Sequence, residues 1–148
     1  WSTWDGSDVP HAGLAAAQVD GGAGCQAGWA LAYESTSVYG ARLQWYLAPS
    51  EGGGSFAFIE LDVGGGFDVG RWYHVVASYD GSNLTLSLDG DRRTAPACAS
   101  PPCGAVSYAT PEGCGAAAGA PFTIGMLVPR GGGGNMHKGA VMSVRLWG

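Results

Sequence analysis

Apolar and polar residues alternate along two stretches of the chain. In residues 84–88 leucine occupies every second position, and in residues 41–47 Leu43, Trp45 and Leu47 alternate with a polar or aromatic set, Arg42, Gln44 and Tyr46. This period of two is typical of a β-strand with one face in the protein interior and the other in solvent. We therefore expect Leu43, Trp45 and Leu47 in the core.

Residues 72–79, which are rich in aromatic and β-branched side chains, precede the leucine stretch. Between them lies Asp80-Gly81-Ser82-Asn83, a run of residues that favour turns because glycine adopts positive φ and Asp and Asn hydrogen-bond to nearby backbone. The pattern predicts an antiparallel hairpin of residues 72–79 with residues 84–88. Asp89-Gly90 is a second turn signal at the end of the hairpin.

Further stretches of strand length occur along the whole chain. In 56–63 the pattern leaves open which face is buried, and the proline-rich segment 91–120 is expected to be mostly an irregular loop. We expect four tryptophans, Trp29, Trp45, Trp72 and Trp147, to lie in the core. The other predicted strands are 14–18, 29–33, 56–63, 105–108, 122–125 and 139–147, and residues 1–4 resemble the end of a strand.

The composition agrees with a small protein made of strands. The 148 residues suit one domain, and 27 glycines and 8 prolines suit many short strands joined by turns. A net charge of -5 with a single lysine argues against binding to nucleic acid or to an anionic membrane. No apolar run approaches the roughly 20 residues that cross a bilayer, so we expect no membrane insertion.

The four cysteines predict disulfides, because their spacing lacks the paired Cys-x-x-Cys of a zinc site. Two disulfides would place the protein outside the cell or on its surface. Four cysteines allow three pairings, among which the sequence does not select; we favour Cys98 with Cys103 and Cys25 with Cys114. Asn83-Leu84-Thr85 is a glycosylation sequon in the predicted turn.

Two motifs carry a resemblance to a known family. The first is Trp-x-His-Val-x-x-x-Tyr-Asp-Gly at 72–81, followed by the alternating leucines, and the second combines Phe-Thr-Ile-Gly at 122–125 with the Val-x-x-Val-Arg-Leu segment at 141–146. Together they resemble laminin-G-like domains, relatives of the concanavalin A-like lectin fold. The resemblance implies an all-β fold, an antiparallel jelly-roll sandwich of two sheets.

Members of that family normally begin one or two strands earlier. We therefore expect residues 1–148 to be a single laminin-G-like domain that lacks N-terminal strands or has been excised from a larger protein.

Glu60 and Asp62 raise the question of catalysis. Laminarinase-type glycoside hydrolases share the jelly roll and carry Glu-x-Asp followed by a second Glu, whereas here Gly64 and Gly65 stand where that residue belongs. Retaining glycosidases need two carboxylates, one as nucleophile and one as acid/base. We therefore expect no enzyme activity, and we expect Glu60 and Asp62 on the solvent face of a strand.

The remaining candidate sites are for metals and ligands. His74 is expected to be structural, and His11 and His137 lack the spacing of a zinc pair. Three aspartates near turns, Asp80, Asp89 and Asp91, are candidate Ca²⁺ ligands because some laminin-G-like relatives bind Ca²⁺ through loop carboxylates, although Asp-Gly also forms turns by itself. Exposed aromatic rings that could stack on a sugar are expected at Tyr39, Tyr46 and Tyr108.

The resemblance implies a non-catalytic extracellular recognition module that binds carbohydrate or another extracellular protein. Fold alone does not determine function, so two alternatives remain open. One is a structural module that associates with itself or with other chains through an open sheet edge. The other is the remnant of a laminarinase-type hydrolase.

Overall fold

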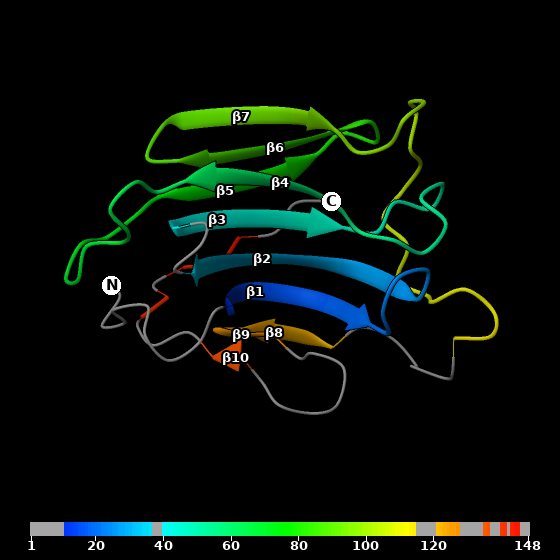
Figure 1. Cartoon of the computed structure of the whole chain (residues 1–148), viewed down its shortest axis with the longest axis horizontal. Coiled ribbons are helices and arrows are strands. Elements are labelled where there is room, and N and C mark those ends of the chain that lie inside the picture. Colours follow the sequence, from blue (N-terminus) through cyan, green and yellow to red (C-terminus); the bar gives the residue numbers. More distant parts are fainter. Residues whose placement is uncertain are drawn as a thin grey trace.

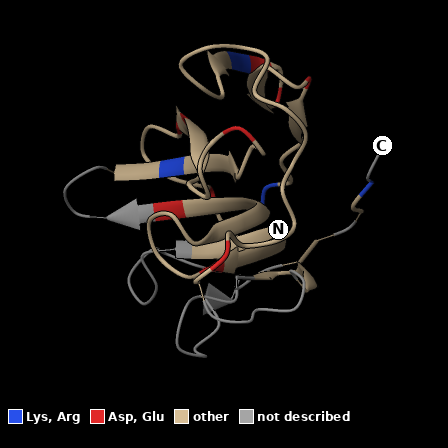
Figure 2. Cartoon of the chain, turned by 90° about the vertical axis from the view of Figure 1, so that its right-hand side faces the viewer, with Lys and Arg blue, Asp and Glu red and all other residues tan. Residues whose placement is uncertain are grey.

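The computed structural model describes residues 11–36, 40–114, 121–127, 135–136, 140–141 and 143–145. These residues form strands and turns without a helix, and the strands make two sheets (Figure 1). No helix in this part of the chain is long and apolar enough to cross a membrane. Charged residues are few and scattered (Figure 2).

The larger sheet has seven strands in the order β4-β3-β2-β1-β10-β9, with β8 also paired to β1. Its strands are antiparallel to their neighbours except for β1 and β10, which pair in parallel. The bounds are β1 His11–Asp20, β2 Gln26–Thr36, β3 Gly40–Leu47, β4 Ala57–Asp62, β8 Phe122–Ile124, β9 Met126–Leu127 and β10 Asn135–Met136.

The smaller sheet is the antiparallel set β5-β6-β7, with β5 at Val75–Tyr79, β6 at Asn83–Leu88 and β7 at Asp91–Pro96. The predicted hairpin is confirmed, because β5 and β6 pair from Val75 opposite Leu88 to Tyr79 opposite Leu84. β7 was not predicted. It occupies the start of the segment that we expected to be irregular.

The core lies between the smaller sheet and the β3–β4 side of the larger one. Leu84 and Leu86 of β6 have no exposed surface, and they belong to the same apolar cluster as Leu43, Leu47 and Ile59. The predicted alternation of β3 is confirmed, with Trp45 also buried. Burying each such leucine stabilises the fold by about 1.5 to 3 kcal/mol. In β4 the pattern left the buried face open, and the structure buries Ile59 while exposing Phe58.

Trp72 and His74 differ from the prediction. Both precede β5, which begins only at Val75, and both are exposed, so the expectation that Trp72 belongs to the core is wrong. Trp29 is half-buried against the core, with its ring 5.5 Å from that of Trp45. Trp147 and residues 1–4 lie outside the described residues.

Two predicted strands are absent from the described structure. Residues 105–108 form only an isolated bridge between Val106 and Pro49. In the predicted strand 139–147, the described positions 140, 141 and 143–145 belong to no strand. Alternation favours a strand locally, but a strand forms only where a neighbouring strand pairs with it.

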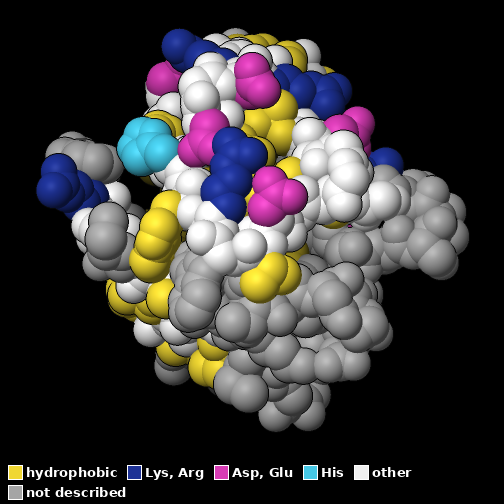
Figure 3. Space-filling model, turned by 90° about the vertical axis from the view of Figure 1, so that its left-hand side faces the viewer, with side chains coloured by type: hydrophobic (Ala, Val, Ile, Leu, Met, Phe, Trp, Pro, Cys, Tyr) yellow, Lys and Arg dark blue, Asp and Glu magenta, His cyan; other side chains and the backbone are white. Residues whose placement is uncertain are grey.

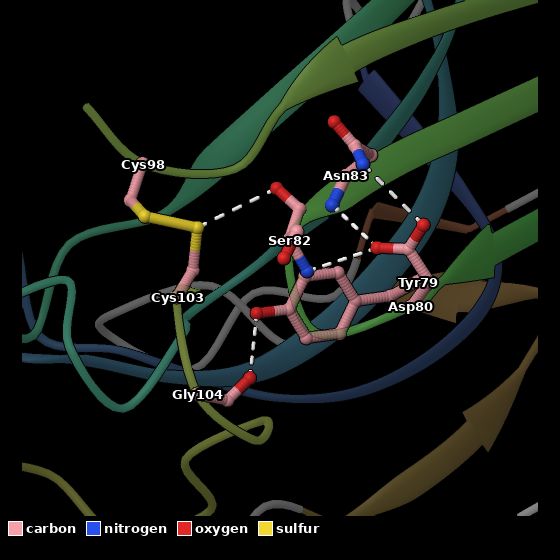
Figure 4. Close-up of a disulfide and its surroundings, with 7 residues drawn as sticks. All are labelled: Tyr79, Asp80, Ser82, Asn83, Cys98, Cys103 and Gly104. Carbon is pink, nitrogen blue, oxygen red and sulfur yellow. Dashed lines mark hydrogen bonds between the residues drawn. A yellow bond between two sulfur atoms is a disulfide. The ribbon is translucent and has the colours of Figure 1, made fainter. Parts of the chain in front are cut away.

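The cysteines form the disulfides Cys25–Cys114 and Cys98–Cys103, which is the pairing that we favoured. The Cys98–Cys103 loop holds the turn between β5 and β6 (Figure 4). Cys103 N–H donates to Gly81 O at 2.7 Å, and the Tyr79 hydroxyl donates to Gly104 O at 2.6 Å. Beyond this loop, Ser107 N–H donates to Ala48 O at 2.8 Å, so the segment also joins the two sheets.

The two disulfides close loops of very different length, 89 and 5 residues apart in sequence. Because a longer loop restricts the unfolded chain more, replacing both Cys25 and Cys114 by Ser should lower the free energy of unfolding by about 4 to 5 kcal/mol, against about 2 kcal/mol for Cys98 and Cys103. Urea titration of the two double variants measures both losses. Equal losses, or a larger loss for the short loop, would contradict the expected dependence of the stabilisation on loop length.

Candidate functional site

The face of β2, β3 and β4 that points away from the core carries a regular array of side chains. The register places Tyr46 opposite Phe58, Gln44 opposite Glu60 and Arg42 opposite Asp62. On the other side of β3, the same three residues face Ala30, Ala32 and Glu34. We call these nine positions the outer grid: Ala30, Ala32, Glu34, Arg42, Gln44, Tyr46, Phe58, Glu60 and Asp62. They alternate with the core residues because successive side chains of a strand point to opposite faces.

One row of the outer grid is aromatic. Phe58 has 63% of its surface exposed, whereas its neighbour Tyr46 is half-buried. The Tyr46 ring lies 5.0 Å from the ring of Phe56 and packs against a cluster of fully buried alanines, including Ala30. This burial, together with the charge of Asp20, raises the pKa of Tyr46 above its usual value. Tyr46 therefore supports the row, and Phe58 is the ring that solvent reaches.

The other two rows are polar and connected to one another. Gln44 Nε2 donates to Glu34 Oε2 at 2.9 Å and to Glu60 Oε1 at 2.7 Å. Arg42 Nη1 donates to Glu60 Oε2 at 3.0 Å, and Arg42 Nε lies 3.4 Å from Asp62 Oδ1. The network crosses three strands, so its side chains are held in one arrangement beside Phe58. Carboxylate oxygens accept more than one hydrogen bond, which leaves them able to bind hydroxyl groups.

The sequence predicted part of this surface. Glu60 and Asp62 were expected on a solvent face, where the structure places them, although Glu60 is only about a quarter exposed. Phe58 was missed. The signal was present, because any register that turns Glu60 and Asp62 outward also turns Phe58 outward and buries Ile59.

The other two predicted aromatic contacts do not join the outer grid in the described structure. Tyr108 is 51% exposed, but it lies in the connecting segment after the Cys98–Cys103 loop. Tyr39 lies outside the described residues. The sequon residue Asn83 begins β6, where its side-chain Nδ2 lies 3.4 Å from Asp80 Oδ2.

The three candidate calcium ligands lie in separate surroundings. Asp80 closes the β5–β6 turn, because its Oδ1 accepts the N–H groups of Ser82 at 2.9 Å and Asn83 at 2.7 Å (Figure 4). Asp89 accepts the His74 N–H at 2.7 Å, and Asp91 is exposed at the start of β7. Within the described residues, no three acidic, histidine or cysteine side chains gather as a metal site would require. The contacts account for Asp80 and Asp89 as turn residues.

These hydrogen bonds predict a pH dependence of stability. The Asn83 and Ser82 amides lower the pKa of Asp80 below its usual value of about 3.9. The stabilisation is therefore fully present above about pH 4 and is lost as the pH falls through the folded-state pKa. Between about pH 5 and pH 2, the urea midpoint of the unchanged protein should fall further than that of Asp80→Asn, which cannot lose a charge. Asp91→Asn is the control, and equal falls for Asp80→Asn and the unchanged protein would contradict the role of Asp80.

A laminin G family model, described as the concanavalin A-like lectin/glucanases superfamily, matches residues 4–148. The chain belongs to this superfamily. Searches of curated proteins and of solved structures find no match to this chain.

Membership in the superfamily confirms the predicted resemblance and the all-β sandwich of two sheets. The superfamily description includes both lectins and glucanases, so it leaves open whether this laminin G-like domain binds, cleaves or does neither. Whether the domain binds or cleaves a ligand must therefore be argued from the residues of the outer grid.

Proposed function

We propose that this laminin G-like domain is a non-catalytic extracellular module that binds carbohydrate on the outer grid. The observation that supports the proposal most strongly is an exposed aromatic ring, Phe58, beside polar groups that already hold one another in place.

A sugar ring offers two kinds of contact, an apolar face of C–H groups and a rim of hydroxyl groups. Phe58 provides an apolar surface for the first. Glu60 and Gln44 lie in the next row of the grid, about 7 to 8 Å away, where hydroxyl groups at the edge of the same sugar would reach them. Because the ladder Glu34–Gln44–Glu60–Arg42 is formed before any ligand arrives, binding loses little side-chain entropy.

The same contacts support binding without cleavage. A glycosidase needs two carboxylates that flank the scissile bond and act as acid and as nucleophile or base. Here both oxygens of Glu60 are engaged, one by Arg42 and one by Gln44, and Arg42 also contacts Asp62. Beyond the end of β4 at Asp62 the chain turns at Gly64 and Gly65, so no second glutamate stands there. We infer that these acidic groups position hydroxyl groups and do not transfer protons.

The disulfides support a location outside the cell. The two disulfides pair all four cysteines of the chain. Such bonds are stable in oxidising compartments and are rare in the cytosol.

Binding is tested on a glycan array that includes neutral β-glucans. We expect saturable binding that Phe58→Ala weakens at least about tenfold, because aromatic stacking on a ligand contributes on the order of 1 to 3 kcal/mol. Phe122→Ala is the matched control, since Phe122 is a similarly exposed phenylalanine on β8. A flat array, or equal losses in both variants, would contradict the proposed surface. Release of reducing ends from the glucans would contradict the non-catalytic assignment.

A second candidate function, assembly with other chains, is favoured by the edge strand β5. β5 pairs only with β6 in the described structure and contains no charged residue. By contrast, the edge strand β7 carries Asp91, Arg92 and Arg93, and the edge strand β4 carries Glu60 and Asp62. Charged residues on edge strands oppose the addition of a foreign strand. The uncharged edge strands β8 and β9 have only three and two residues, so β5, with five, is the edge most open to such addition.

Sedimentation of the purified chain tests this second candidate. If β5 mediates assembly, the unchanged chain sediments as a larger species, and Val76→Lys, which adds a charge to the exposed side of β5, restores the monomer. Thr85→Lys is the control, because Thr85 lies on the central strand β6, where no edge is available. A stable monomer of the unchanged chain at all concentrations removes the assembly candidate.

A further inference from the structure

The segment that joins β4 to β5 is anchored to the core through a row of aromatic rings. We call residues 67–74 the rim loop. The Phe67 ring lies 5.3 Å from the ring of Tyr33, a core residue, and 5.1 Å from the ring of Tyr73 in an edge-to-face arrangement. Such pairs are favourable at these distances, so Phe67 attaches the start of the loop to the sandwich and also packs against Tyr73 near its end.

Polar contacts fix the residues on both sides of Trp72. The Arg71 guanidinium lies 4.7 Å from the centre of the Tyr73 ring, and its Nη2 donates to Asp89 Oδ2 at 2.8 Å. Tyr73 Oη accepts the N–H of Asp68 at 2.7 Å. Asp89 also accepts the His74 N–H at 2.7 Å, which ties the end of the loop to the β6–β7 turn.

Trp72 is an exposed aromatic ring in this well-connected loop. Its neighbours Arg71 and Tyr73 are engaged, whereas Trp72 itself is 52% exposed. An indole on a fixed backbone loses little conformational entropy when a ligand covers it, and tryptophan is enriched among the residues that dominate binding energies. The sequence pattern predicted Trp72 in the core, whereas the structure does not include it in the core cluster.

The charged residues of the rim loop resemble those of the outer grid. There, Phe58 lies beside the ion pair of Arg42 with Glu60. Here, Trp72 follows Arg71, which pairs with Asp68 at 3.5 Å and with Asp89. The Asp68 side chain is 71% exposed and the Arg71 side chain 54% exposed, so both reach solvent. Acidic and basic side chains lie next to one another on this face of the molecule (Figure 3).

We propose that the rim loop is a second carbohydrate-binding surface, in which Trp72 stacks on a sugar ring while the exposed Asp68 and Arg71 bind hydroxyl groups elsewhere on the same polysaccharide. This inference rests on the proposed function, because it assumes that the domain binds carbohydrate. The two surfaces come from different elements, the strands β2–β4 and the rim loop. A single polysaccharide that contacts both is held more tightly than a short oligosaccharide, because the second contact is intramolecular.

The charges favour a neutral polysaccharide over an anionic one as the ligand. Arg71 of the rim loop pairs with Asp68 and Asp89, and Arg42 of the outer grid pairs with Glu60 and Asp62 and faces Glu34 in the strand register. The chain as a whole carries a net charge of -5. Sulfated or uronic acid polymers would meet like charge at both surfaces.

The test compares Trp72→Ala, Phe58→Ala, the double variant and the control Phe122→Ala on laminarin, a neutral polymeric β-glucan, and on short laminarin oligosaccharides. On the polymer, each single variant should bind at least about tenfold more weakly than the unchanged domain, and the double variant should not bind. On the oligosaccharides, calorimetry should show two sites per domain, reduced to one in each single variant. Heparin should not bind.

The outcomes separate this inference from the function on which it rests. If Phe58→Ala abolishes binding while Trp72→Ala binds the polymer as the unchanged domain does, the function stands and the second surface is wrong. If the unchanged domain binds neither form of laminarin, both are wrong. Trp72→Ala should keep the unchanged urea midpoint because Trp72 is exposed, and Trp72→Phe should recover part of the polymer binding. A Trp72→Phe variant as weak as Trp72→Ala would overturn the stacking role.

Discussion

The alternation of side chains along β3 is the constraint on which the rest of the structure depends. Leu43, Trp45 and Leu47 enter the core, while Arg42 and Gln44, together with Tyr46, form the middle column of the outer grid. Because the side-chain period of a strand is two, a slip of one residue in the pairing of β3 would exchange the two sets. The cost of exposing those leucines therefore also fixes the surface that we propose for recognition.

The polar network of the outer grid contributes more to geometry than to stability. Partly exposed ion pairs such as Arg42–Glu60 stabilise folded proteins by only about 0.2 to 1 kcal/mol, less than one of the buried leucines of β6. Gln44 joins Glu34 to Glu60 through two side-chain hydrogen bonds on this partly exposed face. The network holds hydrogen-bond acceptors and donors at fixed positions, as the proposed binding of a ligand requires.

The parts of the fold that could be predicted are those decided by local pattern. The β5–β6 hairpin and the core face of β3 follow from alternation and turn residues within a few positions. β7 was missed because its residues Asp91–Pro96 are polar and charged, and only pairing with β6 makes them a strand. Trp72 was misplaced because the predicted strand begins only at Val75, three residues later. The loop before it is held by Tyr33 and Asp89, which are distant from it in sequence, so a local pattern does not reveal these contacts.

The outer grid was only partly visible in the sequence for the same reason. The sequence singled out Glu60, Asp62 and Tyr46 by residue type. Their position beside Gln44 and Arg42 depends on the register of three strands, which the sequence does not show. An NMR titration of the isotope-labelled domain with short laminarin oligosaccharides shows whether the sugar binds on the outer grid. Binding there should shift the Phe58 and Glu60 amides and the Gln44 side-chain amide. Shifts absent from β3 and β4, with binding mapped only to other strands, would contradict binding on the outer grid.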